Sequence, residues 1–143
     1  MERDCGAWIN ILSHRLKRRL DSTLASLGIN ALQSRVLHYV RVHYRDGPVF
    51  QRDVENTFGL SRSTATGILQ HLEREGFICR ESVLEDGRLK SLVPTEKAVE
   101  VDEQVHACLQ KIEMEMTAGL SPGQLQMFME TVSKMSSNLN VNG

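Results

Sequence analysis

The sequence lacks the features that mark secreted, membrane and metal-binding proteins. Its three cysteines, Cys5, Cys79 and Cys108, are too few and too widely spaced for a disulfide scaffold or a C-x-x-C metal site. No run approaches the roughly 18 consecutive apolar residues of a membrane span. The N-terminus is too charged for a secretory signal. We therefore expect a cytoplasmic protein with reduced thiols that neither enters a membrane nor carries a cofactor.

The motifs of enzymes are also missing. The 143 residues contain no nucleophile elbow, phosphate-binding loop or paired-carboxylate motif. The five histidines lack the i, i+4 spacing of a helical metal pair, and His38 and His43 fall on roughly opposite helix faces. There is no internal repeat, low-complexity tract or linker. We predict a protein of single-domain size that is not an enzyme and holds no metal.

The net charge is only −1, but its sign changes along the chain. Residues 1–60 hold 9 Lys and Arg against 6 Asp and Glu, residues 61–95 hold 5 against 5, and residues 96–143 hold 3 against 7. A protein can present a local basic surface while an acidic far end keeps it soluble. The charge pattern alone does not distinguish this arrangement from random scatter.

Apolar residues spaced by three or four positions predict helices over most of the chain. The first helix, about 20 residues long, carries Trp8 and Leu27 at the two ends of its apolar stripe and ends at Gly28. Asn30 is a good N-cap for a second helix. A short helix then runs from about residue 51 to 58 and ends at Gly59.

Ser61 caps a further helix, and after it the pattern changes to short strands. Residues 77–81 and 89–93 form a predicted hairpin, because the Asp86-Gly87 dipeptide between them is a strong turn signal. Pro94 ends the second strand, since proline cannot donate a hydrogen bond to the ladder.

Two helices complete the chain. Thr95 caps a long helix that runs to about Ala118, and Ser121-Pro122 begins the last one. The apolar residues of the last helix are spaced 3-4-3-4, as in a coiled-coil seam.

This order of elements predicts a mainly α fold (α+β class) with three regions. Residues 32–94 form a winged helix-turn-helix module with a two-stranded wing, and residues 1–31 and 95–143 form a helical dimerisation region. The flanking apolar stripes are longer than so small a module can cover, so pairing with a second copy is the economical solution. The alternative is an intramolecular six-helix core.

The helix after Ser61 has the composition of a DNA recognition helix. At 100° per residue, one face is apolar and packs inward, and the opposite face is polar. Short hydroxyls and an amide can contact base edges or phosphates, and a glycine lets the backbone approach closely. Gln70 suits adenine. The predicted DNA-binding residues of this helix are Arg62, Ser63, Thr64, Thr66, Gly67, Gln70 and Arg74.

The hairpin supplies the remaining predicted DNA-binding residues, Asp86, Arg88 and Lys90. A basic side chain on a projecting arm can enter a narrow A·T-rich minor groove, where the potential is most negative. Asp86 can hold the Arg88 guanidinium in position through a charge-assisted hydrogen bond. The alternative for Arg88 is an exposed ion pair worth about 0–1 kcal/mol.

Four segments together resemble the MarR (multiple antibiotic resistance regulator) family of winged helix-turn-helix transcription factors. They are Leu60–Thr66, Leu72–Ile78, the Asp86-Gly87-Arg88 wing and Pro94–Lys97. The resemblance extends over nearly the whole chain. Two positions depart from the family pattern, which usually has leucine at Pro94 and glycine at Ala98. Both departures look structural.

The resemblance implies a homodimer bound to a pseudo-palindromic operator in double-stranded DNA. The two recognition helices would enter successive major grooves and the wings the flanking minor grooves. Such proteins usually repress, and many release DNA when a small, often aromatic anion binds between the winged module and the dimerisation helices. Others respond to thiol oxidation or a metal.

Two alternatives for the function stay open. Cys5, near the start of the first helix, is the candidate redox residue of a thiol-oxidation-sensing regulator, although Glu2 and Asp4 oppose its ionisation. Cys79 and Cys108 are predicted to be small buried hydrophobes. The other alternative is a winged-helix protein-interaction module without DNA binding.

Overall fold

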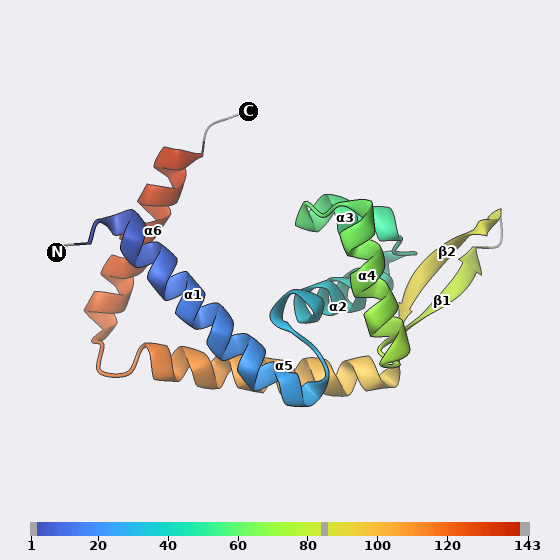
Figure 1. The fold of residues 1–143 in the computed structure, drawn as a ribbon, viewed down its shortest axis with the longest axis horizontal. Coiled ribbons are helices and arrows are strands. Elements are labelled where there is room, and N and C mark those ends of the chain that lie inside the picture. The colour runs from blue at the N-terminus through green and yellow to red at the C-terminus, as the bar shows by residue number, and fades with distance from the viewer. Residues whose placement is uncertain (1–2, 84–85, 141–143) are drawn as a thin grey trace. The chain divides into compact units, whose positions relative to one another are not determined.

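The computed structural model describes residues 3–83 and 86–140, with only the backbone of Asp86 and Gly87. The chain divides into two compact units, residues 1–109 and 110–143. Its helices and strands follow one another along the chain as shown in Figure 1. In order they are α1 (Cys5–Leu24), η1 (Ala25–Leu27), α2 (Ala31–His43), η2 (Tyr44–Asp46), α3 (Gln51–Phe58), α4 (Arg62–Arg74), β1 (Ile78–Val83), β2 (Asp86–Pro94), α5 (Glu96–Met116) and α6 (Pro122–Leu139).

The helix ends lie where the capping residues predict them. The side chains of Asn30, Ser61 and Ser121 each accept a hydrogen bond from a backbone N–H in the first turn of the helix that follows. Gly28 and Gly59 end their helices with φ of 76° and 62°, a left-handed conformation that costs a glycine little. The mainly α fold with one two-stranded sheet is confirmed.

The first unit is built around one hydrophobic core. Each of α1 to α4, the hairpin and α5 contributes side chains to it, and Phe77 is the largest that is fully buried. From α4 it receives one side of the helix: Ala65, Ile68, Leu69 and Leu72. Because this face is held in the core, the direction in which the opposite face of α4 points is determined.

β1 and β2 form an antiparallel hairpin that projects from the helices (Figure 1). At its base, the backbone N–H of Leu92 donates to the Val49 carbonyl at 2.7 Å, and the Thr95 hydroxyl donates to the Gly76 carbonyl at 2.7 Å. The first bond ties β2 to the segment before α3, and the second joins the residues on either side of the hairpin, so that its far end extends from a fixed base.

The hairpin differs from the prediction in its length and in the position of its turn. The two strands extend beyond the predicted segments, and Asp86 pairs with Val83 at the start of β2. The Asp86-Gly87 pair therefore belongs to the strand, and the prediction that it forms the turn is wrong. The register shifts between Ser82 and Val83, an irregularity that local turn propensity does not reveal.

Cys79 is exposed, so the prediction that it is buried is also wrong. Side chains alternate between the two faces of a strand. Its neighbour Ile78 is buried in the core, and Cys79 therefore points the other way. Cys108 is half-buried and packs against the core, whereas Cys5 is exposed.

Several apolar residues of α5 and α6 are exposed in the single chain. Leu109 and Met116 on α5 are about two-fifths exposed, and Phe128 on α6 is 52% exposed. No residue of α6 is buried.

Candidate nucleic-acid interface

The polar face of α4 is presented to solvent. The Ser61 hydroxyl oxygen accepts a hydrogen bond from the Thr64 backbone N–H at 3.1 Å, and this cap fixes the start of the helix. Six of the seven predicted residues of α4 are exposed: Arg62, Ser63, Thr64, Gly67, Gln70 and Arg74. Thr66 is only partly exposed.

Gly67 lies at the middle of this face with open space above it. A Cβ atom added at Gly67 would meet nothing within 4 Å. Packing in the protein therefore does not require the glycine. Its absent side chain instead leaves the backbone of α4 accessible to a large partner, as the sequence predicts.

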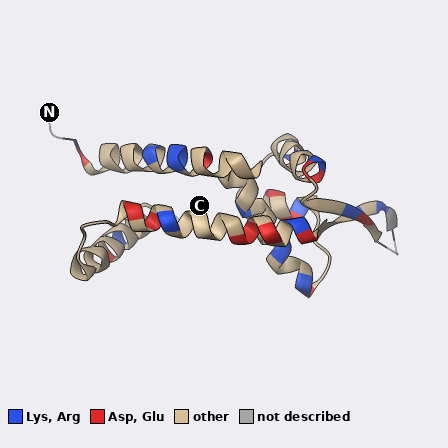
Figure 2. Cartoon of the chain, turned by 90° about the horizontal axis from the view of Figure 1, so that it is seen from below, with Lys and Arg blue, Asp and Glu red and all other residues tan. Residues whose placement is uncertain are grey.

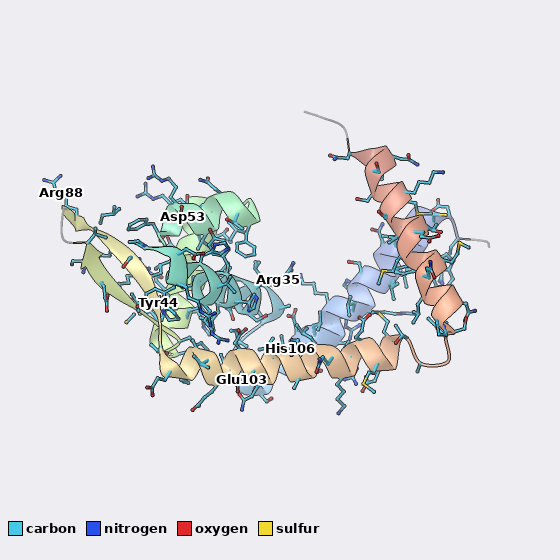
Figure 3. The ribbon with its side chains drawn as sticks, turned by 180° about the vertical axis from the view of Figure 1, so that it is seen from behind. Arg35, Tyr44, Asp53, Arg88, Glu103 and His106 are labelled. Carbon is cyan, nitrogen blue, oxygen red and sulfur yellow. The ribbon has the colours of Figure 1, made fainter. Side chains whose placement is uncertain are left out.

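The wing carries its basic residues near its far end. Figure 3 shows Arg88 there, at the tip of the hairpin, and Arg88 and Lys90 are both exposed. They lie two residues apart in β2, which is the spacing of side chains on one face of a strand. The Asp86 side chain lies outside the described residues, so its contact with Arg88 stays a prediction.

A groove of about 640 Å³ connects the wing with α3 and α4. Five of its lining side chains are cationic and one is acidic, an imbalance that favours an anionic occupant. Figure 2 shows Lys and Arg positions, in blue, on the wing and on the helices beside it. The lining residues are Phe50, Gln51, Arg52, Glu55, Arg62, Thr66, Arg80, Arg88, Leu89 and Lys90.

Sequence reasoning missed Arg52 and Arg80, two of the five cations. Arg52 is exposed in the first turn of α3, and Arg80 lies in β1, where its Nε is 3.3 Å from Glu73 Oε2 of α4. The available signal was weak, because one arginine in a short helix and one in a strand are ordinary surface residues. Only the approach of α3 and the wing brings them to one groove.

A second cavity, of about 800 Å³, lies between α2 and α5 within the first unit. Figure 3 shows Arg35 of α2 and Glu103 and His106 of α5, all of which line it. Tyr39 contributes an aromatic wall, with its ring against that of His43 at 4.2 Å between centroids and 37° between the ring planes. The remaining lining residues are Ser34, His38, Arg41, Val42, His43, Phe58, Asp102, Val105 and Leu109.

The described residues were also compared with the requirements of a metal site and of a membrane span. They contain no group of three or more His, Cys, Asp or Glu side chains placed to hold a metal ion. Within the same part of the chain, no helix combines the length and apolarity that crossing a membrane requires.

The geometry of this face, a solvent-exposed α4 beside a basic hairpin, can be compared with known proteins. A family model described as the MarR family matches residues 27–89. The resemblance to the MarR family is confirmed. The MarR match includes α2, α3, α4, β1 and the start of β2, the elements that build the exposed face and the basic groove.

Solved structures of MarR-type regulators have the same fold over nearly the whole chain. One is MepR, a transcription regulator of the multidrug efflux pump MepA of Staphylococcus aureus, with 22% identity, a TM-score of 0.82 and coverage of 96% of this chain and 100% of MepR. The structure of MepR in a complex with DNA has 23% identity and a TM-score of 0.76, and the match covers 96% of this chain and 97% of MepR. The transcription regulator MarR from Oenococcus oeni has 25% identity and a TM-score of 0.65, and the match covers 94% of this chain and 99% of that regulator.

These comparisons also bear on the prediction that the chain is not an enzyme. The matched family and the solved structures described above are those of transcription regulators, which agrees with that prediction. The roles of the individual residues of α4 and of the wing stay predictions.

Proposed function

We propose that this protein is a sequence-specific, dimeric DNA-binding transcriptional regulator, a repressor relieved by a small-molecule ligand. The observation that carries the proposal is the groove between α4 and the wing, which is lined by five cationic side chains and one acidic side chain. The likeness to MepR, whose structure includes a complex with DNA, supports it. Such a regulator works on chromosomal DNA in the cytoplasm.

In this proposal the two basic elements have separate tasks. The exposed face of α4 enters the major groove, where base edges carry a unique pattern of donors and acceptors. Arg88 at the tip of the wing enters the flanking minor groove. Arg62 and Lys90 contact phosphates, and these contacts position the protein on the duplex without reading its sequence. Residues 32–94 thus form the DNA-binding module.

The exposed apolar residues support the dimer. A single chain leaves Trp8 and Leu12 of α1, and Phe128 of α6, between two-fifths and about one-half exposed. Side chains of this size are rarely left in water together, and a second copy of residues 1–31 and 95–143 would cover them. A twofold-symmetric dimer also presents two copies of α4 to a pseudo-palindromic operator.

The cavity between α2 and α5 supports a small effector. Its volume of about 800 Å³ suits a small organic molecule. Tyr39, Phe58 and Val105 provide aromatic and apolar walls, and Arg41 provides a cation, a combination that favours a small aromatic or anionic ligand. Because α2 belongs to the DNA-binding module, a ligand in this cavity can alter the placement of that module.

A duplex-binding experiment tests the central claim. Genomic fragments selected by the protein supply the operator. Fluorescence anisotropy then measures the affinity of the protein for this operator between about 50 and 200 mM salt. We expect specific binding that weakens steeply with salt, since each neutralised phosphate releases counterions. A protein that binds no duplex at low salt would instead be a winged-helix interaction module.

The thiol-oxidation alternative has its own test. Cys5 and Cys79 are both exposed and accessible to peroxide. If oxidation of the Cys5 thiol were the signal, peroxide would release the wild type from the operator and leave the Cys5→Ser variant bound. Under our proposal, peroxide has the same small effect on both proteins.

A further inference from the structure

The hydroxyl group of Thr66 is engaged within the protein on two sides. It donates a hydrogen bond to the Arg62 carbonyl oxygen, one helical turn earlier, at 2.8 Å. It accepts one from Nε2 of Gln51, in the first turn of α3, at 2.9 Å. The same Nε2 atom also donates to the Arg62 carbonyl oxygen at 3.4 Å, so two hydrogen bonds fix the Gln51 side chain against α4.

These two hydrogen bonds limit what Thr66 can offer to DNA. A hydroxyl has a single proton, and in Thr66 that proton is directed to the backbone of α4. Thr66 therefore cannot donate to an acceptor on a base edge unless it gives up an internal hydrogen bond. The hydroxyl oxygen keeps one lone pair that can still accept a hydrogen bond, and the γ-methyl is the apolar group that Thr66 can offer to a base.

The position of Thr66 makes this methyl relevant. Thr66 is one turn from exposed Gln70 and next to Gly67, whose open surface lets a base pair come close to α4. It also lines the basic groove between α3, α4 and the wing. A duplex seated on α4 would thus bring a base edge to the Thr66 side chain.

We propose that Thr66 is a specificity-determining residue that recognises a thymine by contact between its γ-methyl and the C5-methyl of the base. This inference rests on the proposed function, since it assumes that α4 enters the major groove. Thymine is the base of unmodified DNA that carries a methyl group in that groove, so an apolar contact there selects it. Each half-site of the operator then contains one thymine read in this way.

The test removes one methyl group from the DNA and, separately, one from the protein. Each thymine of the selected operator is replaced in turn by deoxyuridine, which differs only in lacking the C5-methyl. Affinity is measured for the wild type and for Thr66→Ser, which keeps the hydroxyl and loses the methyl. Thr66→Val is the matched control, because it keeps a methyl at this place and loses the hydroxyl.

We expect the wild type to lose about fourfold in affinity at one thymine per half-site, the value of one buried methylene-sized group. Thr66→Ser should show no loss when that thymine is replaced. Thr66→Val should keep the wild-type sensitivity. Thermal unfolding of both variants before titration verifies that each is folded.

Two results would overturn the inference, and a third would remove its basis. If Thr66→Ser keeps every sensitivity of the wild type, its methyl contacts no thymine. If Thr66→Val loses a sensitivity that Thr66→Ser keeps, the hydroxyl is the reading group. If the wild type binds no duplex, the proposed function fails together with the inference, and this outcome is distinct from the other two.

Discussion

The carboxylate of Asp102 in α5 accepts a hydrogen bond from Nδ1 of His38 in α2 at 3.0 Å. The same carboxylate forms an ion pair with Arg41, one turn further along α2. The Asp102 side chain is only 13% exposed, so this bridge is largely shielded from water. It also lines the cavity between the two helices, and it therefore connects the proposed ligand site to the DNA-binding module.

Asp102→Asn should destabilise the protein by about 1–3 kcal/mol, because it leaves the Arg41 guanidinium half-buried without its anion. Urea unfolding monitored by circular dichroism measures the free energy of unfolding. Glu100→Gln, an exposed acidic position on the same helix, is the control and should change stability little. Equal stability of the two variants would mean that the bridge contributes nothing.

Arg88→Ala should weaken binding to operators flanked by A·T pairs and leave folding unchanged. The expected reason is loss of a guanidinium from a narrow minor groove, where the potential is most negative. Anisotropy titrations with A·T-rich and G·C-rich flanks measure the effect. Lys134→Ala, an exposed cation on α6, is the control. Equal affinities of mutant and wild type for A·T flanks would refute the role of the wing.

Arg52→Ala should reduce the slope of log affinity against log salt by about 1 per protomer, if Arg52 neutralises one phosphate. Its position in the first turn of α3, on the wall of the basic groove, is the basis of this expectation. The measurement is a salt series on one operator, with Lys134→Ala again as control. An unchanged slope would exclude Arg52 from the contact with the backbone of DNA.

Gln70→Ala should cost about 1–3 kcal/mol at a single base-pair position if Gln70 reads an adenine. Its exposure at the centre of the polar face of α4 allows a bidentate contact. A panel of operators with one substituted base pair each locates the position. A uniform loss on every operator would instead identify Gln70 as a contact to phosphate.

Removal of residues 121–143 should give a monomeric or insoluble protein. The deletion takes away α6, none of whose residues is buried in the single chain and which the proposal places in the dimer interface. Sedimentation equilibrium of the full chain and of the shortened chain measures the oligomeric state. A stable dimer of residues 1–120 would contradict the proposed interface.

The sequence alone determined where the helices begin and end. Asn30, Ser61 and Ser121 cap their helices through hydrogen bonds to residues three positions away, and Gly28 and Gly59 end theirs through a local left-handed turn. Interactions of this range depend on neighbouring residues only, so their pattern is visible in the chain. The apolar face of α4 was predictable for the same reason.

Tertiary structure alone decided which side chains meet. Asp102 lies 61 residues from Arg41 along the chain, and Gln51 lies 15 residues from Thr66. Arg52 and Arg80 reach one groove only through the packing of α3 and the hairpin. Cys79 reaches solvent because β1 packs its opposite face, with Ile78, into the core. Such contacts follow from how helices and strands pack around a common core, and that packing depends on the shapes of all the buried side chains together.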